Sequence, residues 1–205
     1  AFAFMADRRA STAGGGIRFT EQMHSSPTTA EPAIRLHLAG HIPSLNRFLT
    51  DPEHTINVEG TIELPRRTPA RTRGTMRLFP RSSSAIMLYD LEFTDDRDHP
   101  SALTGSKTLR GRGLLALLRS LTTLDTELTH SGTRQRTSTT LTIRPRHVVH
   151  LLQSIAGEGF TGPRRACTRL RFVAFFARST LRSVWKRNCQ SSDQGLSEAS
   201  AHAEH

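Results

Sequence analysis

Apolar and polar side chains alternate along the chain between residues 34 and 146, with the period of two that half-buried antiparallel strands show. The clearest alternation covers residues 34–42, 56–64 and 85–94. Four shorter runs share it, at residues 76–78, 103–109, 124–128 and 141–143. The pattern therefore predicts about seven strands.

Short segments with turn chemistry join these runs, at residues 65–69, 95–100 and 131–132. Links of this length imply antiparallel neighbours, because a parallel pair needs a crossover of about a dozen residues or more. A meander with one apolar face must close on itself or stack to hide that face and its edges. We expect a mainly β fold in which the meander closes into a lipocalin-like barrel, with a sandwich as the alternative.

Two helices are predicted after the strands, over residues 147–156 and beyond Pro163. In the second helix, apolar residues from Leu170 to Val184 form one row. A second row is basic and comprises Arg171, Arg178, Arg182 and Lys186. Such a helix either covers the barrel with its apolar face or lies on an anionic membrane with Trp185 and the phenylalanines inserted.

The length of 205 residues suits one domain with tails. We expect a single domain over residues 17–187 between disordered segments at residues 1–16 and 188–205. The apolar stretch at residues 1–6 is too short for a signal peptide, and its charges follow rather than precede it. No apolar run approaches the roughly 20 residues of a membrane-spanning helix. The expected location is therefore cytoplasmic or at the periphery of a membrane.

The formal net charge is +10, and the excess is concentrated in residues 128–192, which hold 12 basic residues and one acidic residue. Of the 28 basic residues, 26 are arginines, which bind phosphate and carboxylate groups well. A solvated basic face accounts for this skew without a partner. The charge therefore does not favour nucleic acid as a partner, whereas an anionic membrane surface stays open.

Signatures of catalysis and of cofactor binding are missing from the sequence. Two cysteines exclude a disulfide framework and a four-cysteine zinc site, and the ten histidines form no His-Glu-x-x-His motif. There is no Gly-x-Ser-x-Gly elbow and no glycine fingerprint for a flavin or a dinucleotide. We therefore predict no catalytic residue, no metal site and no cofactor in this chain.

One lysine falls on a predicted inward face. The alternation places Lys107 on the same side of its strand as Leu103, and Tyr89 and Met87 face inward on another strand. A lysine and a tyrosine inside a barrel fit a pocket for a small ligand with a polar head, so these four residues are the candidate ligand site. Replacing Lys107 by Ala is then expected to weaken ligand binding without unfolding the domain. A shift of one residue in register would instead turn Lys107 outward.

A series of short motifs also has a counterpart in a known family. They are Phe19-Thr20-Glu21-Gln22-Met23, Gly60-Thr61-Ile62, Met87-Leu88-Tyr89, Leu103-Thr104-Gly105-Ser106-Lys107 and Thr122-Thr123-Leu124. Their order resembles an extra region of long bacterial proteins related to the glucose–methanol–choline oxidoreductases, the cholesterol-oxidase-like members. The resemblance covers roughly residues 17 to 186.

What this resemblance implies is limited by what the chain lacks. The family's flavin fingerprint and its catalytic His and Asn are missing, so oxidase activity is not carried over. Within a larger protein, the resemblance would imply an oxidoreductase acting on sterol-like alcohols. For this chain it implies an accessory module beside such an enzyme.

The sequence thus leads to one main hypothesis and two alternatives. The main hypothesis is a non-catalytic module that binds an apolar small molecule, such as a lipid or sterol, or docks to a redox or hydrolase polypeptide. The first alternative is a peripheral module that binds membrane or nucleic acid through residues 128–192. The second is a fragment of a cholesterol-oxidase-like flavoenzyme. The least favoured reading, which the sequence leaves open, is an enzyme in its own right that uses interior side chains on a bound substrate.

Overall fold

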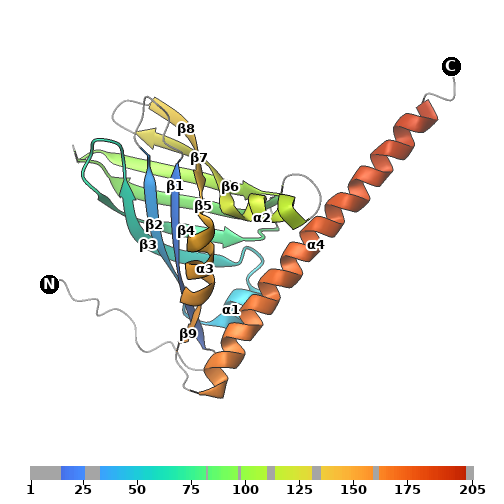
Figure 1. The fold of residues 1–205 in the computed structure, drawn as a ribbon, viewed down its shortest axis with the longest axis horizontal. Helices are drawn as coiled ribbons and strands as arrows, with labels where there is room; N and C mark the ends of the chain where they lie inside the picture. The colour runs from blue at the N-terminus through green and yellow to red at the C-terminus, as the bar shows by residue number, and fades with distance from the viewer. Residues whose placement is uncertain are drawn as a thin grey trace.

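In the computed structural model, the described residues form a closed antiparallel barrel of eight strands with one additional strand and four helices (Figure 1). The structure describes residues 15–25, 33–81, 83–96, 98–109, 114–130, 135–158 and 162–201. The barrel strands are β1 (Gly16–Ser25), β2 (Arg35–Ile42), β3 (Thr55–Glu63), β4 (Ala70–Leu78), β5 (Ala85–Thr94), β6 (Pro100–Thr108), β7 (Thr123–His130) and β8 (Gln135–Thr142). The predicted barrel is confirmed.

Strand β1 closes the barrel, because it pairs with β2 along its length and with β8 at its end. The pairing with β8 joins His24 to Thr142 and Ser25 to Leu141. The extra strand β9 (Ala156–Glu158) pairs with the other end of β1, from Gly16 to Arg18. Strand β1 is therefore held by three neighbours, two of which, β8 and β9, come from late in the chain.

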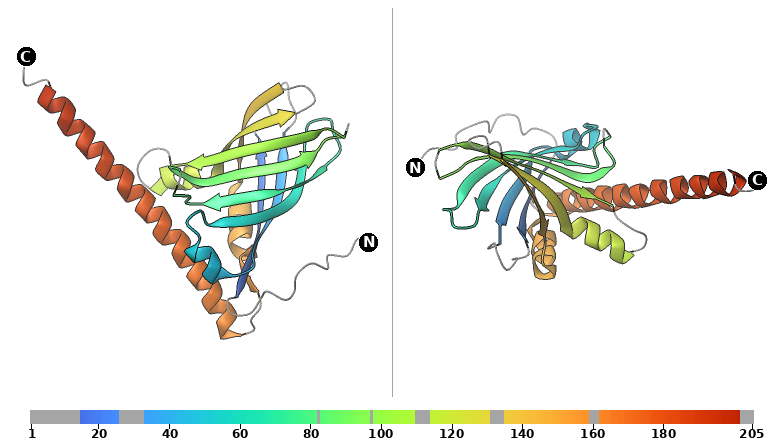
Figure 2. Two further views of the ribbon diagram at one scale, coloured as in Figure 1. Left: turned by 180° about the vertical axis from the view of Figure 1, so that it is seen from behind. Right: turned by 90° about the horizontal axis from the view of Figure 1, so that it is seen from above.

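The helices lie outside the barrel and cover its seam and one end (Figure 2). Helix α3 (Pro145–Ser154) packs on β1, and its Ser154 hydroxyl accepts a hydrogen bond of 2.9 Å from the backbone N–H of Thr20. Helix α1 (Leu45–Thr50) follows β2, and helix α2 (Leu114–Thr122) precedes β7. Helix α4 (Pro163–Ala201) starts beside β9, crosses one end of the barrel and projects beyond it.

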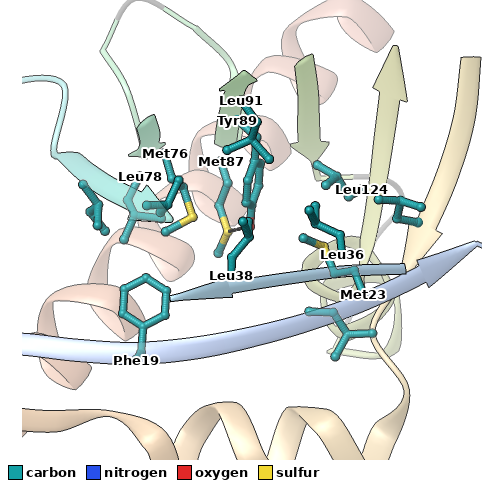
Figure 3. Packing of buried hydrophobic residues seen from close by; sticks show 14 of the residues in the cluster. Phe19, Met23, Leu36, Leu38, Met76, Leu78, Met87, Tyr89, Leu91 and Leu124 are labelled. Atoms are coloured by element: carbon teal, nitrogen blue, oxygen red, sulfur yellow. Dashed lines mark hydrogen bonds between the residues drawn. The ribbon is translucent and has the colours of Figure 1, made fainter. Parts of the chain in front are cut away.

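The core consists of the inward-facing apolar side chains of the barrel (Figure 3). Ile56, Leu91 and Leu124 are among those with no exposed surface. Two glycines allow adjacent strands to approach and bend at the wall. A Cβ atom on Gly60 would lie 1.8 Å from the carbonyl oxygen of His37, and one on Gly74 would lie 2.0 Å from that of Asp90. No larger residue fits at either position without a shift of the backbone.

Several elements differ from the prediction. Strands β1 and β9 and helices α1 and α2 were not predicted, and α3 begins and ends two residues earlier than expected. In β1, Ile17, Phe19 and Met23 alternate properly, but the inward Glu21 interrupts their apolar row.

Helix α4 continues to Ala201, past residue 187, at which the predicted domain ends. Its Ser, Gln, Glu and Ala residues have little to bury, and their helix propensity is still sufficient to extend a helix that is already formed. The disorder predicted for residues 1–14 and 202–205 lies outside the described residues.

Candidate functional site

A buried ion pair lies inside the barrel and joins strands β1 and β6. The Nζ atom of Lys107 donates a hydrogen bond of 2.5 Å to Oε1 of Glu21. Lys107 is 1 % exposed and Glu21 is 4 % exposed. Burying either charge alone would cost several kcal/mol, so each side chain makes the burial of the other tolerable.

Tyr89 of β5 completes this interior cluster. Its hydroxyl donates a hydrogen bond of 2.8 Å to the second carboxylate oxygen of Glu21. The ammonium group of Lys107 lies 5.4 Å from the centre of the Tyr89 ring, which is within range of a cation–π interaction. Burial raises the pKa of the Tyr89 phenol well above its usual value, and the neighbouring Glu21 carboxylate raises it further. The phenol therefore stays protonated and acts as a donor.

The other two predicted ligand residues also face the interior. The Sδ atom of Met87 lies 3.4 Å from the Tyr89 hydroxyl, and Leu103 is fully buried in the apolar core. The structure thus brings Lys107, Tyr89 and Met87 together, as the alternation predicts, whereas Leu103 contributes packing. All four have less than a tenth of their surface exposed, so side chains rather than solvent surround the pair.

Glu21 is the residue that the sequence reasoning missed. Its inward position follows from the alternation of Ile17, Phe19 and Met23 in the same strand. A single inward carboxylate and a single inward ammonium group in one predicted barrel would have indicated their pairing. The geometry makes Glu21 and Lys107 partners of each other and gives the pair a role in holding β1 against β6.

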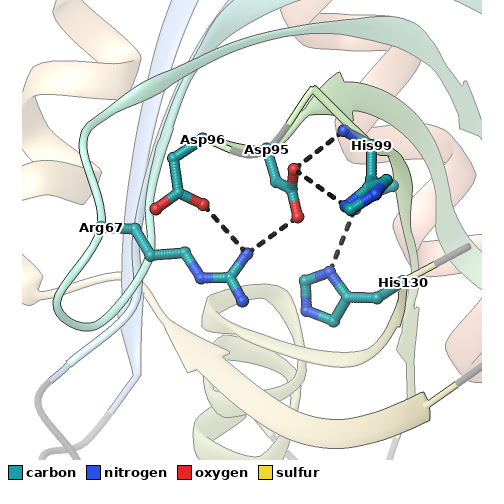
Figure 4. A network of polar contacts seen from close by, with 6 residues as sticks. Arg67, Asp95, Asp96, His99 and His130 are labelled. Atoms are coloured by element: carbon teal, nitrogen blue, oxygen red, sulfur yellow. Dashed lines mark hydrogen bonds and ion pairs between the residues drawn. The ribbon is translucent and has the colours of Figure 1, made fainter. Parts of the chain in front are cut away.

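A second polar cluster links the β3–β4 and β5–β6 turns (Figure 4). Arg67 lies 3.1 Å from Asp95 and 3.5 Å from Asp96, and Asp95 accepts a hydrogen bond from the backbone N–H of His99. Nearby, the hydroxyl of Ser101 lies 3.0 Å from Nδ1 of His130. In the described part of the chain, no three His, Cys, Asp or Glu side chains are placed to bind a metal ion. The contacts of Asp95 with Arg67 and His99 hold the two turns in place at one end of the barrel.

One face of helix α4 is anchored to the barrel by aromatic contacts. The rings of Phe172 and Phe175 lie 6.0 Å and 5.4 Å from that of Phe48 in α1. The ring of Phe175 also lies 4.7 Å from that of His54, while Phe176 packs on Phe79 at 5.3 Å. The helix therefore covers the barrel with its phenylalanine face and not with the predicted row that includes Leu170 and Leu181, which is exposed, and the phenylalanines are not free to enter a membrane.

The opposite face of α4 is apolar and exposed. Leu170, Leu181 and Trp185 are 68 %, 66 % and 72 % exposed, and Val173 is 40 % exposed. Their spacing of three, four and eight residues places them along one side of the helix. Arg171, Arg178 and Arg182 are exposed and lie beside this row. Lys186 lies in α4, but its side chain is outside the described residues.

Described residues line two hollows, and the second is lined in part by the buried residues Glu21 and Phe93. The first has a volume of about 640 Å³ and lies between the end of α3, β9 and the first turns of α4. The second has a volume of about 1170 Å³ and is lined by three consecutive residues from each of β1 to β6. Carboxylates and guanidinium groups both line the second hollow, among them Glu59, Glu92, Arg71 and Arg73, so it favours no sign of ligand charge.

Among the helices that the structure describes, none has a stretch both long and apolar enough to cross a bilayer. Comparison with protein-family models, with curated proteins and with solved structures found no match to this chain. The resemblance to the cholesterol-oxidase-like accessory region therefore stays a prediction.

Proposed function

We propose that this protein is a non-catalytic module that associates with anionic membrane surfaces through helix α4. One observation carries the proposal. The helix presents an exposed apolar row, Leu170 to Trp185, directly beside an exposed row of arginines. Amphipathic helices that lie in the membrane interface combine these two features.

The apolar row supports burial against another apolar phase. Leucine and tryptophan side chains each gain on the order of 1.5–3 kcal/mol when they leave water completely. Four such side chains along one helix face form a patch of the kind that marks an interaction surface. Because Phe172 and Phe175 already hold the opposite face on α1, the exposed row is available while the barrel stays folded.

The charge of α4 favours a negatively charged partner. Residues 163–192 contain no aspartate or glutamate, whereas Arg171, Arg178 and Arg182 line the exposed face. Each basic side chain near an anionic leaflet contributes about 1 kcal/mol. A second copy of the helix would bring two rows of arginines together without carboxylates to offset them, and nucleic acid would leave the leucines and Trp185 in water.

The hypothesis of ligand capture inside the barrel stays a prediction. The Glu21–Lys107 pair and the packed side chains around it favour a structural role for the interior. The exposed large apolar side chains of the described residues lie on α4, so we place the function there.

The test is co-sedimentation of the protein with phospholipid vesicles. We expect binding to vesicles that contain phosphatidylserine, weak binding to pure phosphatidylcholine, and an affinity that falls as salt is raised. Replacement of Arg171, Arg178 and Arg182 by Gln should weaken binding by about a hundredfold, from about 1 kcal/mol per arginine. Leu181→Ser should weaken it as well, because a buried apolar contact is lost.

A matched control changes the same charge elsewhere. Arg35, Arg73 and Arg136 are exposed on the barrel strands, and their replacement by Gln lowers the net charge equally. If this control loses as much affinity as the α4 variant, binding follows net charge and the proposal is wrong. Binding of nucleic acid at the same salt concentration, without vesicle binding, would also overturn it.

A further inference from the structure

The first turns of α4 form one wall of a groove. Its other wall is β9 with the end of α3, and its volume of about 640 Å³ is in the range of small-ligand sites. The lining residues with apolar side chains or none are Ile155, Ala156, Gly157, Gly162, Ala166, Leu170 and Val173. The remaining three are Gln153, Arg165 and Arg169.

Small residues determine the shape of this groove. A Cβ atom on Gly157 would lie 2.8 Å from the carbonyl oxygen of Arg165, so β9 and α4 touch there through their backbones. Ala156 and Ala166 fill little of the space on either side. Seven of the ten described lining residues therefore offer apolar side chains or none.

The charged side chains among the described lining residues of the groove are both arginines. Arg165 and Arg169 are four residues apart, which places them on the same side of α4, and both line the groove. None of the described residues that line the groove is an aspartate or a glutamate. An anion is therefore favoured at the groove, and an alkyl chain is favoured along its floor.

We propose that this groove binds the single alkyl chain of an anionic amphiphile, with its head group at Arg165 and Arg169. The proposal rests on the proposed function for the source of the ligand, because Leu170 and Val173 belong both to the groove and to the exposed face of α4. A lipid of an anionic leaflet would reach the groove when α4 lies on the membrane.

The experiment is calorimetric titration of the full chain with dodecyl phosphate below its micelle-forming concentration. We expect saturable binding of one molecule, at least about tenfold weaker binding of dodecyl maltoside, and no binding of inorganic phosphate. Ala166→Leu fills the groove with a good helix former, and Arg165→Gln removes one charge. Each should weaken dodecyl phosphate binding at least about tenfold, whereas Arg136→Gln, on β8, should leave it unchanged.

Two readouts separate this proposal from the proposed function. The unfolding midpoint shows whether Ala166→Leu has folded, and Arg165→Gln tests the site without a change in packing. If the wild type and both variants bind dodecyl phosphate equally, the groove is not the binding site, whether or not the protein binds vesicles. If the protein binds dodecyl phosphate specifically but does not bind vesicles, the groove site is supported and the membrane is not the source of its ligand.

Discussion

The ammonium group of Lys107 and the carboxylate of Glu21 meet inside the barrel although the two residues are 86 positions apart in the chain. They lie on strands β6 and β1, which are not neighbours in the sheet. Only closure of the barrel brings the inward faces of these strands together. The pair therefore contributes to the closed form and to none of the local hairpins.

Removal of one member of this pair should destabilise the fold strongly. For Lys107→Met we expect a loss of about 3–5 kcal/mol in the free energy of unfolding, because the buried Glu21 would lose its oppositely charged partner and keep only the hydrogen bond from Tyr89. This replaces the expectation that Lys107→Ala leaves the domain folded. Urea unfolding of the variants measures the loss.

The double variant Glu21→Gln with Lys107→Met is the control for this prediction. It removes both charges and keeps an amide oxygen that Tyr89 can donate to. Its loss should be smaller than that of Lys107→Met alone. Glu21→Gln and Lys107→Met are also measured separately. If the loss in the double variant equals the sum of these two losses, the two side chains do not interact.

Tyr89 should make the fold sensitive to alkali. Its phenol has a raised pKa in the folded state, so above about pH 10 the unfolded chain releases a proton that the folded chain keeps. Stability from this group is complete below pH 10 and is lost as the pH rises toward the folded pKa. Tyr89→Phe should lose less stability between pH 9 and pH 11 than the wild type, as measured by unfolding at each pH. Parallel losses would contradict the raised pKa.

His54 should make the contact between α4 and the barrel sensitive to acid. Burial beside Phe48 and Phe175 lowers its pKa below the usual value of 6.5, and its Nδ1 atom has no hydrogen-bond partner among the described residues. As the pH falls below 6.5, the unfolded chain takes up a proton that the folded chain resists, so stability falls.

The comparison for this prediction is His54→Asn. Asparagine tolerates the positive φ of 46° at this position and does not titrate. The variant should lose less stability than the wild type between pH 7 and pH 5. The nearby Asp51, whose pKa is lowered from 3.8, affects stability only at still lower pH. An identical pH dependence of the two proteins would contradict the role of His54.

Phe175 should be the main anchor of α4. Its ring contacts those of Phe48, His54 and Phe79, and it is half-buried. Phe175→Ala should cost about 2 kcal/mol, roughly half the loss of a fully buried phenylalanine, and should speed proteolysis within α4. Arg178→Ala changes an exposed position of the same helix and should leave proteolysis unchanged. Equal cleavage of the wild type and Phe175→Ala would show that α4 is held elsewhere.

Much of the fold could be predicted because each strand from β2 to β7 has one apolar face, as in the alternation of Ile56, Val58 and Ile62. Lys107 and Tyr89 were placed inward by the same argument. Strand β1 was missed because Glu21 interrupts its apolar row. The charge of Glu21 is compensated by Lys107, which lies on a strand that reaches Glu21 only when the barrel closes. The groove was beyond prediction, since β9 and α4 approach through the backbone at Gly157, a contact that leaves no side-chain pattern.

The most direct test of membrane binding through α4 uses Trp185, the single tryptophan of the chain, which is 72 % exposed on this helix. Its fluorescence is measured with phosphatidylserine vesicles whose acyl chains carry bromine, a quencher located within the bilayer. Membrane binding through α4 predicts that the emission of Trp185 shifts to shorter wavelength and is quenched, and that high salt reverses both changes. Neither change should occur with vesicles of phosphatidylcholine alone. Vesicle binding with unchanged Trp185 emission, or no binding at low salt, would contradict membrane binding through α4.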